Sequence, residues 1–191
     1  PQSYYREAVW LGNKNFKIFT THPEHYGEGF SGTEWHFYDV NQTWTFDDIY
    51  VGRPITAEVY TDADKVEWYI NGRMVGESVP EKCVARIDTT YEKGNICAIA
   101  YKNGAEYAKA SLHTTGQPTA INIVPEQSLF IADNRDLYYF DISIVDSEGR
   151  LISDAENELT CLVQGGELLG IYSANPCSED CFTSNTCHAF K

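Results

Sequence analysis

The chain has 191 residues, with 14 Lys or Arg against 28 Asp or Glu, so its formal net charge is −14 and its pI is about 4.6. This acidity argues against partners such as nucleic acid or an anionic membrane surface, because both need clustered basic residues. No apolar run approaches the roughly 18 residues of a membrane span, and a complete barrel enzyme of about 250 residues is excluded by length.

Residues 1–44 show no sustained helical or strand period. Ser3 to Leu11 could make two helical turns with Ser3 as the N-cap residue. Closely spaced glycine and proline after His22 predict a loop. We therefore expect a mostly irregular leader and linker with at most one short helix. The start at Pro1 rather than at a methionine suggests a piece of a larger protein.

Residues 45–116 have the period of two that is typical of β-strands. Apolar side chains alternate with polar ones in two segments: Ile55, Ala57 and Val59, then Val66, Trp68 and Ile70. Asn71-Gly72 and Asn103-Gly104 predict two type I′ hairpin turns, because both residue types tolerate a positive φ. Two hairpins so close together predict an antiparallel sheet.

Gly116-Gln117-Pro118 interrupts this pattern and predicts a domain boundary. A second all-β block follows, with a turn at residues 146–149 and three alternating apolar sets: Ile121 and Ile123; Tyr138, Phe140, Ile142 and Ile144; Leu159, Cys161 and Val163. The predicted fold is therefore all-β, with two tandem immunoglobulin-like antiparallel β-sandwich domains at residues 45–116 and 117–191. Each domain is shorter than the about 100 residues typical of such sandwiches, so either the sheets are small or strands are missing.

These segments resemble a known family. The run YTDADKVEWYINGRMVG, residues 60–76, is similar to the sandwich that follows the catalytic barrel in bacterial glycoside hydrolase family 2 enzymes of β-galactosidase type. Residues 43–46 and 91–121 resemble the segment before that sandwich and its closing hairpin. Residues 144–170 resemble the next immunoglobulin-like domain, and SYYREAVW, residues 3–10, resembles the end of the barrel. The resemblance covers nearly the whole chain in the family's order.

The resemblance implies that the catalytic residues lie outside this chain. Family members are retaining glycosidases with two glutamates about 5–5.5 Å apart, and both belong to the barrel. Asn157-Glu158 is similar to the family's asparagine-glutamate acid/base pair, but here it opens a predicted sandwich strand, so we assign it no role. We expect no catalytic residue, no cofactor and no hydrolysis by this segment alone.

The resemblance also implies binding partners and an incomplete second domain. The catalytic barrel of the same polypeptide is the expected partner, and carbohydrate and a homo-oligomer of the full-length enzyme are further candidates. A further apolar strand usually follows this point in the family. We therefore expect the second domain to be truncated at its C-terminus, with an incomplete sandwich or an exposed edge.

Three aromatic residues in the irregular segment are candidates for substrate binding, because sugar rings stack on exposed aromatic faces: Trp35, Tyr38 and Trp44. The alternative, which we favour, is that they pack between the sandwich and the barrel.

Candidate metal sites are weak. The six cysteines are not spaced as structural zinc ligands, and their disulfide pairing cannot be derived. Without a visible disulfide framework they favour a reducing interior such as the bacterial cytoplasm. The cluster His22, Glu24 and His25 lacks the geometry of a metalloprotease helix, and Asp62 and Asp64 lack the other ligands of an EF-hand. We expect no metal.

The sequence thus supports one main hypothesis and two rivals. The main one is a non-catalytic C-terminal region of a β-galactosidase-type enzyme, which supports the barrel, active-site access or oligomerisation. The rivals are an independent carbohydrate-binding module and an adhesive or structural tandem of a cell-surface protein. The sugar stays open, with β-galactoside first and β-glucuronide as the fallback.

Overall fold

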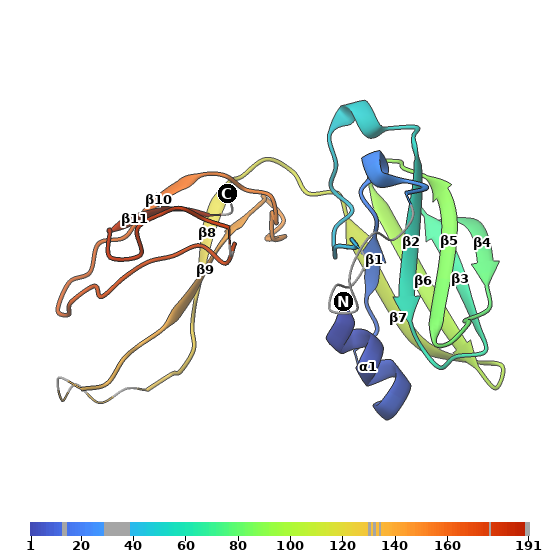
Figure 1. Cartoon of the computed structure of the whole chain (residues 1–191), viewed down its shortest axis with the longest axis horizontal. Coiled ribbons are helices and arrows are strands. Elements are labelled where there is room, and N and C mark those ends of the chain that lie inside the picture. The colour runs from blue at the N-terminus through green and yellow to red at the C-terminus, as the bar shows by residue number, and fades with distance from the viewer. Residues whose placement is uncertain are drawn as a thin grey trace. The chain divides into compact units, whose positions relative to one another are not determined.

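The computed structural model describes residues 1–12, 15–28, 39–129, 131, 133, 135–175 and 177–189. The chain forms two compact units, Pro1–Thr114 and Thr115–Lys191 (Figure 1). In the described residues every strand pairing is antiparallel, and the helices are one α-helix and two short 3-10 helices. The predicted all-β class with a single short leading helix is therefore confirmed.

The described residues of the first unit form two sheets. A three-stranded sheet has the order β1-β2-β5, with β1 at Ile18–Thr20, β2 at Pro54–Tyr60 and β5 at Val84–Thr90. A four-stranded sheet has the order β4-β3-β6-β7, with β3 at Lys65–Ile70, β4 at Arg73–Ser78, β6 at Asn95–Lys102 and β7 at Ala105–His113. The 3-10 helices are η1, Pro23–His25, and η2, Asp48–Tyr50.

Both predicted hairpin turns are present. Asn71 and Gly72 join β3 to β4 with φ of 49° and 76°, and Asn103 and Gly104 join β6 to β7 with φ of 52° and 77°. Two successive residues with positive φ are the mark of a type I′ turn, whose twist matches that of the flanking strands. The turn residues therefore set the register of β3 with β4 and of β6 with β7 next to each turn.

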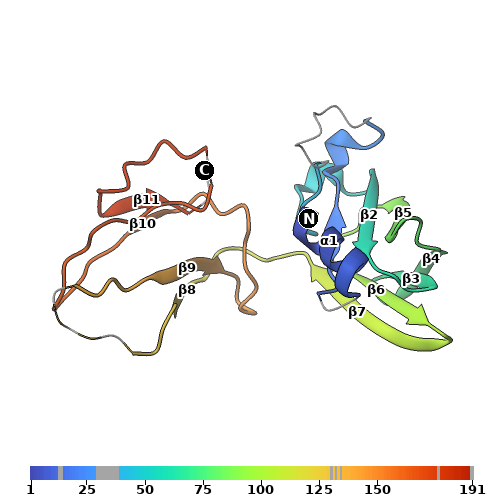
Figure 2. The same cartoon turned by 60° about the horizontal axis from the view of Figure 1, so that its bottom comes forward.

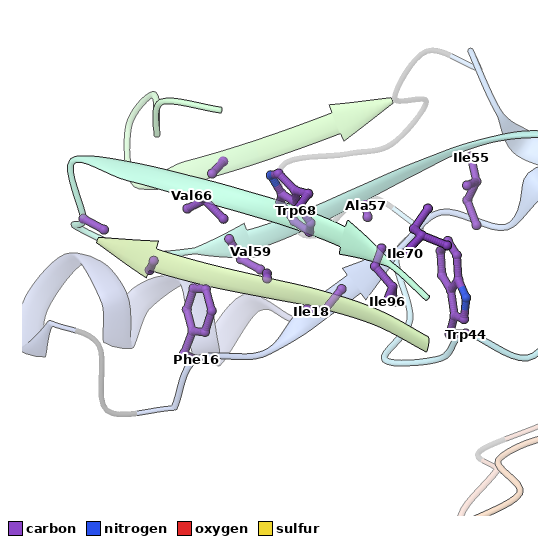
Figure 3. Close-up of a cluster of buried hydrophobic side chains, with 14 of the residues drawn as sticks. Phe16, Ile18, Trp44, Ile55, Ala57, Val59, Val66, Trp68, Ile70 and Ile96 are labelled. Atoms are coloured by element: carbon purple, nitrogen blue, oxygen red, sulfur yellow. The ribbon is translucent and has the colours of Figure 1, made fainter. Parts of the chain in front are cut away.

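The core of the first unit lies between its two sheets (Figure 3). The alternating residues predicted to share faces on β2 and β3 are all buried, including Val59 and Trp68, which are fully inaccessible. They form one hydrophobic cluster with inward residues of β6, such as Ile96 and Ala98. Burial on both facing surfaces makes this unit a β-sandwich.

The segment expected to be a separate leader is part of this unit. Helix α1 spans Gln2–Leu11, with Pro1 rather than Ser3 at its N-cap position, and its Ala8 is buried against Phe19 and Tyr60. Strand β1 pairs with β2 from Ile18, opposite Val59, to Thr20, opposite Ala57. A strand of three residues is too short to show a period, so the sequence pattern could not reveal this pairing.

In the second unit, the part of the chain that the structure describes forms two two-stranded sheets (Figure 2). Strand β8, Ala120–Pro125, pairs with β9, Phe140–Val145, and β10, Glu158–Thr160, pairs with β11, Thr186–His188. Its buried cluster is small: Ile144, Ile152 and Ala155, with Leu159 and Ala189 packed against them. The predicted inward set after Leu159 does not continue, since β10 ends at Thr160 and Val163 is exposed.

The predicted turn at residues 146–149 is confirmed. The amide of Gly149, with φ of 76°, donates to the carbonyl of Asp146 at 3.0 Å. The buried Asp146 carboxylate also accepts hydrogen bonds from the backbone amides of Gly116 at 3.0 Å, Glu148 at 2.9 Å and Arg150 at 2.9 Å. These amides, Gly116 first, hold the pKa of Asp146 below its usual value. One side chain thus ties the turn to the chain that enters the second unit.

Candidate functional site

The three aromatic candidates do not form a site in the described part of the chain. Trp35 and Tyr38 lie outside the described residues. Trp44 is fully buried, its indole Nε1 donates to the carbonyl of Glu92 at 2.9 Å, and its ring meets Tyr91 edge-on at 5.2 Å (Figure 3). A ring with no exposed face cannot stack on a sugar or pack against another domain, so Trp44 is a core residue of the first unit.

Trp44 also anchors the residue with which the first unit ends. The Thr114 hydroxyl donates to the carbonyl of Trp44 at 2.9 Å and accepts from the amide of Gly94 at 3.0 Å. The amide of Thr114 donates to the carbonyl of Gly94 at 2.7 Å. These partners lie far away in sequence, so local pattern could not identify the role of Trp44.

A buried carboxylate that sequence reasoning missed lies on the outer face of the three-stranded sheet. Glu58 is 1% exposed, and it accepts a hydrogen bond from the Tyr60 hydroxyl and one at 2.7 Å from Arg86 Nε. A buried carboxylate needs such partners. Alternation along β2 marks this face as polar and solvated, but α1 and its aromatic residues cover it. Its burial and its two partners favour a structural role for Glu58.

The side chains of His22 and His25, near η1, have partners within the first unit. Nδ1 of His25 lies 2.7 Å from Oδ2 of Asp39, and Nδ1 of His22 accepts the amide of Glu24 at 3.2 Å. The His22 ring packs edge-on against Tyr50 at 4.8 Å. In the part of the chain that the structure describes, no three His, Cys, Asp or Glu side chains come together as metal ligands.

We expect the imidazole pKa of His25 to lie above its ordinary 6.5, chiefly because its Nδ1–H donates a hydrogen bond to the Asp39 carboxylate, with smaller contributions from Glu28 and Glu24. Any stability this pair adds is present below pH 6.5 and lost as the pH rises through the raised value. It is small, because both side chains are exposed. A proton NMR titration should show Asp39→Asn returning the pKa towards 6.5, whereas Glu28→Gln should lower it less. Equal effects of the two substitutions would contradict the pairing.

Among the described residues, the cysteines and the aspartates near residue 62 also do not come together as a metal site. All six cysteines are unpaired, and burial raises the thiol pKa of Cys97 and Cys187. Asp62 pairs with Lys102 at 2.5 Å, and Asp64 accepts the amide of Asn103 at 2.6 Å. Within the described residues, none of the helices combines the length and apolar character needed to cross a membrane.

Comparison with known proteins relates the chain to glycoside hydrolases. A model of glycoside hydrolase family 2 C-terminal domain 5 matches residues 121–191, and a model of a domain of unknown function, DUF4982, matches residues 52–108. The chain is 32% identical to a β-galactosidase of Bacteroides ovatus over 136 residues, which are 69% of this chain and 16% of that protein. The chain therefore spans less than a fifth of this relative.

Solved structures of family 2 enzymes also resemble this chain. The crystal structure of a glycosyl hydrolase family 2 member from Bacteroides cellulosilyticus matches with a TM-score of 0.87 and 29% identity, over 98% of this chain and 26% of that chain. A β-glucuronidase from family 2 matches with a TM-score of 0.62 over 81% of this chain and 14% of that one, but at 23% identity it shows the fold alone. Residues 121–191 thus match a C-terminal domain of glycoside hydrolase family 2, and the chain as a whole is similar to part of family 2 enzymes.

Proposed function

We propose that this chain is a non-catalytic C-terminal region of a family 2 glycosidase that hydrolyses terminal β-linked galactose. The observation that carries the proposal is the match of almost the entire chain to about a quarter of a family 2 enzyme. Two family models lie in order along the chain, one in each compact unit. The two carboxylates of a retaining glycosidase would then lie in the other part of the parent protein.

The substrate proposal rests on the relative with the higher sequence identity. That relative is a β-galactosidase at 32% identity over 69% of this chain, whereas a putative β-glucuronidase of Formosa agariphila is 24% identical over 78% of it. β-Galactoside is therefore the first candidate substrate of the parent enzyme. β-Glucuronide is the second.

Helix α1 offers a surface for the proposed contact with the catalytic barrel of the same polypeptide. Its Ala8 is buried in the first unit, while Val9, Trp10 and Leu11 are exposed, Trp10 by 75%. Three consecutive exposed apolar residues at the end of a helix are typical of a surface that another domain covers. Through this contact the two sandwiches, immunoglobulin-like in our proposal, would support the barrel and the assembly of the enzyme.

An independent carbohydrate-binding module has less support. Of the three aromatic residues on which that hypothesis depends, Trp44 is buried in the core. A tandem of cell-surface domains gains no support either, because residues 121–191 match a C-terminal domain of family 2 glycoside hydrolases.

We expect the purified 191-residue chain to release no nitrophenol from nitrophenyl β-galactoside or β-glucuronide. The full-length parent protein should hydrolyse the galactoside faster than the glucuronide, since the binding energy that its active site uses for the transition state is specific to the sugar. Hydrolysis by the 191-residue chain, or a parent protein that hydrolyses neither substrate, would overturn the proposal. Faster hydrolysis of the glucuronide would mean that the substrate of the parent enzyme is a β-glucuronide rather than a β-galactoside.

A further inference from the structure

Four of the six cysteines lie in the second unit, whose core is small. Among the described residues its hydrophobic cluster holds three buried side chains, Ile144, Ile152 and Ala155, against fifteen in the main cluster of the first unit. Domains of fewer than about 80 residues with so little buried apolar surface are commonly held together by covalent cross-links. The positions of these four cysteines therefore bear on how the second unit is stabilised.

Two of the four thiols, those of Cys161 and Cys187, lie on the same face of the β10–β11 pair. Cys187 is opposite Leu159. Cys161 is one residue beyond the end of β10, and it donates its amide to the carbonyl of Asn185 at 2.8 Å. Because side chains alternate along a strand, both cysteines share the face of Leu159, which packs with Ala189 against the core. Cys161 and Cys187 are thus diagonal neighbours across the two strands.

This separation is close to what a disulfide needs. Diagonal neighbours in an antiparallel pair have Cα atoms about 7–8 Å apart and Cβ atoms closer, whereas a disulfide joins Cα atoms about 4.4–6.8 Å apart. A movement of about 1 Å closes the difference, and Cys161 can supply it because β10 ends at Thr160. The two thiols already interact: burial raises the pKa of Cys187 most, and Asp180 and Cys161 raise it further.

The segment between these two cysteines has little regular structure. In the described residues no helix or strand lies between β10 and β11, and Tyr172 in this segment is 72% exposed. A cross-link stabilises a fold by restricting the unfolded chain, and its effect grows with the length of the loop that it closes. A bond between Cys161 and Cys187 would close the whole segment, whereas one between Cys177 and Cys181 would close only a few residues.

We propose that Cys161 and Cys187 form a disulfide bond that stabilises the β10–β11 pair. The structure has both residues as free thiols, with Cys161 the more exposed. The Cys161 thiolate attacks a small disulfide such as oxidised glutathione and releases one glutathione thiol, and the Cys187 thiolate then attacks the mixed disulfide and releases the second. The protein loses two electrons and two protons, which convert the glutathione disulfide into two thiols.

The proposed bond does not depend on the proposed enzyme function. Disulfides of this kind persist in oxidising compartments. The bond therefore favours such a compartment over the reducing interior that the cysteine spacing favours.

Peptide mapping tests the pairing. The 191-residue chain is equilibrated with excess oxidised glutathione, digested and analysed by mass spectrometry, and a linked peptide pair with Cys161 and Cys187 is expected. Cys97 is an internal control, because it is also buried on a strand but lies opposite Tyr69 and Ser111, so it should remain a thiol. A free Cys187, or Cys187 paired with a different cysteine, would overturn the proposal.

Loop-closure entropy distinguishes pairing directed by the fold from random pairing. An unfolded chain closes short loops more readily than long ones. Oxidation in urea should therefore replace the bond between Cys161 and Cys187 by one between Cys177 and Cys181. In native buffer the double variant Cys177→Ser/Cys181→Ser should still form the proposed bond, and its failure to do so would contradict direct pairing.

Hydrogen exchange measures the stabilisation. The amide of Cys161, which bonds to the carbonyl of Asn185, should exchange about 100-fold more slowly in the oxidised chain than in the reduced one, as a cross-link that closes a loop of this length predicts. Cys187→Ser should remove the difference between oxidised and reduced chain, whereas Cys97→Ser should keep it. Equal exchange rates in the oxidised and reduced wild-type chain would show that the bond does not stabilise the strand pair.

Discussion

Replacing Trp44 by alanine should lower the free energy of unfolding of the first unit by about 3–5 kcal/mol, the usual cost of removing a buried tryptophan. The indole is fully buried and its Nε1 bonds to the carbonyl of Glu92. Its loss leaves a cavity and an unpaired carbonyl. Urea unfolding followed by tryptophan fluorescence measures the change, since the buried Trp68 remains as a reporter.

Two variants serve as controls for this result. Trp44→Phe keeps an aromatic ring but loses the bond to Glu92, so it should cost less than Trp44→Ala. Trp10→Ala removes an exposed indole and should change the free energy by less than about 0.5 kcal/mol. If Trp44→Ala were as mild as Trp10→Ala, the core position of Trp44 would be wrong.

Gly94→Ala should be the next most harmful substitution, at about 2–4 kcal/mol, because backbone strain costs about 1–3 kcal/mol and the lost hydrogen bonds about 1 kcal/mol. Gly94 has φ of +124°, and a Cβ there would lie 2.0 Å from Oδ1 of Asn71. To escape, the Asn71 side chain would have to leave the amide of Asn95, at 2.8 Å, and the carbonyl of Lys93, at 3.0 Å. Urea unfolding again provides the measurement.

The chain contains a matched glycine for comparison. Gly104 also has a positive φ, but no atom would lie within 4 Å of a Cβ there, so Gly104→Ala should cost only the about 1–2 kcal/mol of a left-handed residue. Asn71→Gly should also relieve part of the cost of Gly94→Ala, so the double variant should be more stable than the sum of the two single changes. Additive costs would show that the contact with Asn71 is unimportant.

The sequence predicted the first sandwich well where the information is local. Alternation placed Val59 and Trp68 on buried faces, and two asparagine-glycine pairs located both I′ turns. These signals depend on neighbouring residues and on backbone sterics alone. The same reasoning found the turn at residues 146–149.

It failed where a role depends on distant parts of the chain. Trp44 lies in a segment without a period, and its partners Tyr91 and Glu92 come more than 40 residues later. Glu58 occupies a position that alternation assigns to solvent, but α1 covers that face of β2. Both residues are therefore more buried than local pattern indicates, although one is an aromatic residue and the other a carboxylate.

The pairing of β1 with β2 determines how the first sandwich can be moved between proteins. A graft that begins at residue 45 would discard β1 and α1, and with them Phe16, Ile18 and Trp44 from the core. It would uncover one edge of β2 and the carboxylate of Glu58. Recombination that preserves a folded module therefore has to carry residues 1–114 together, with the helix and the sandwich inherited as one piece.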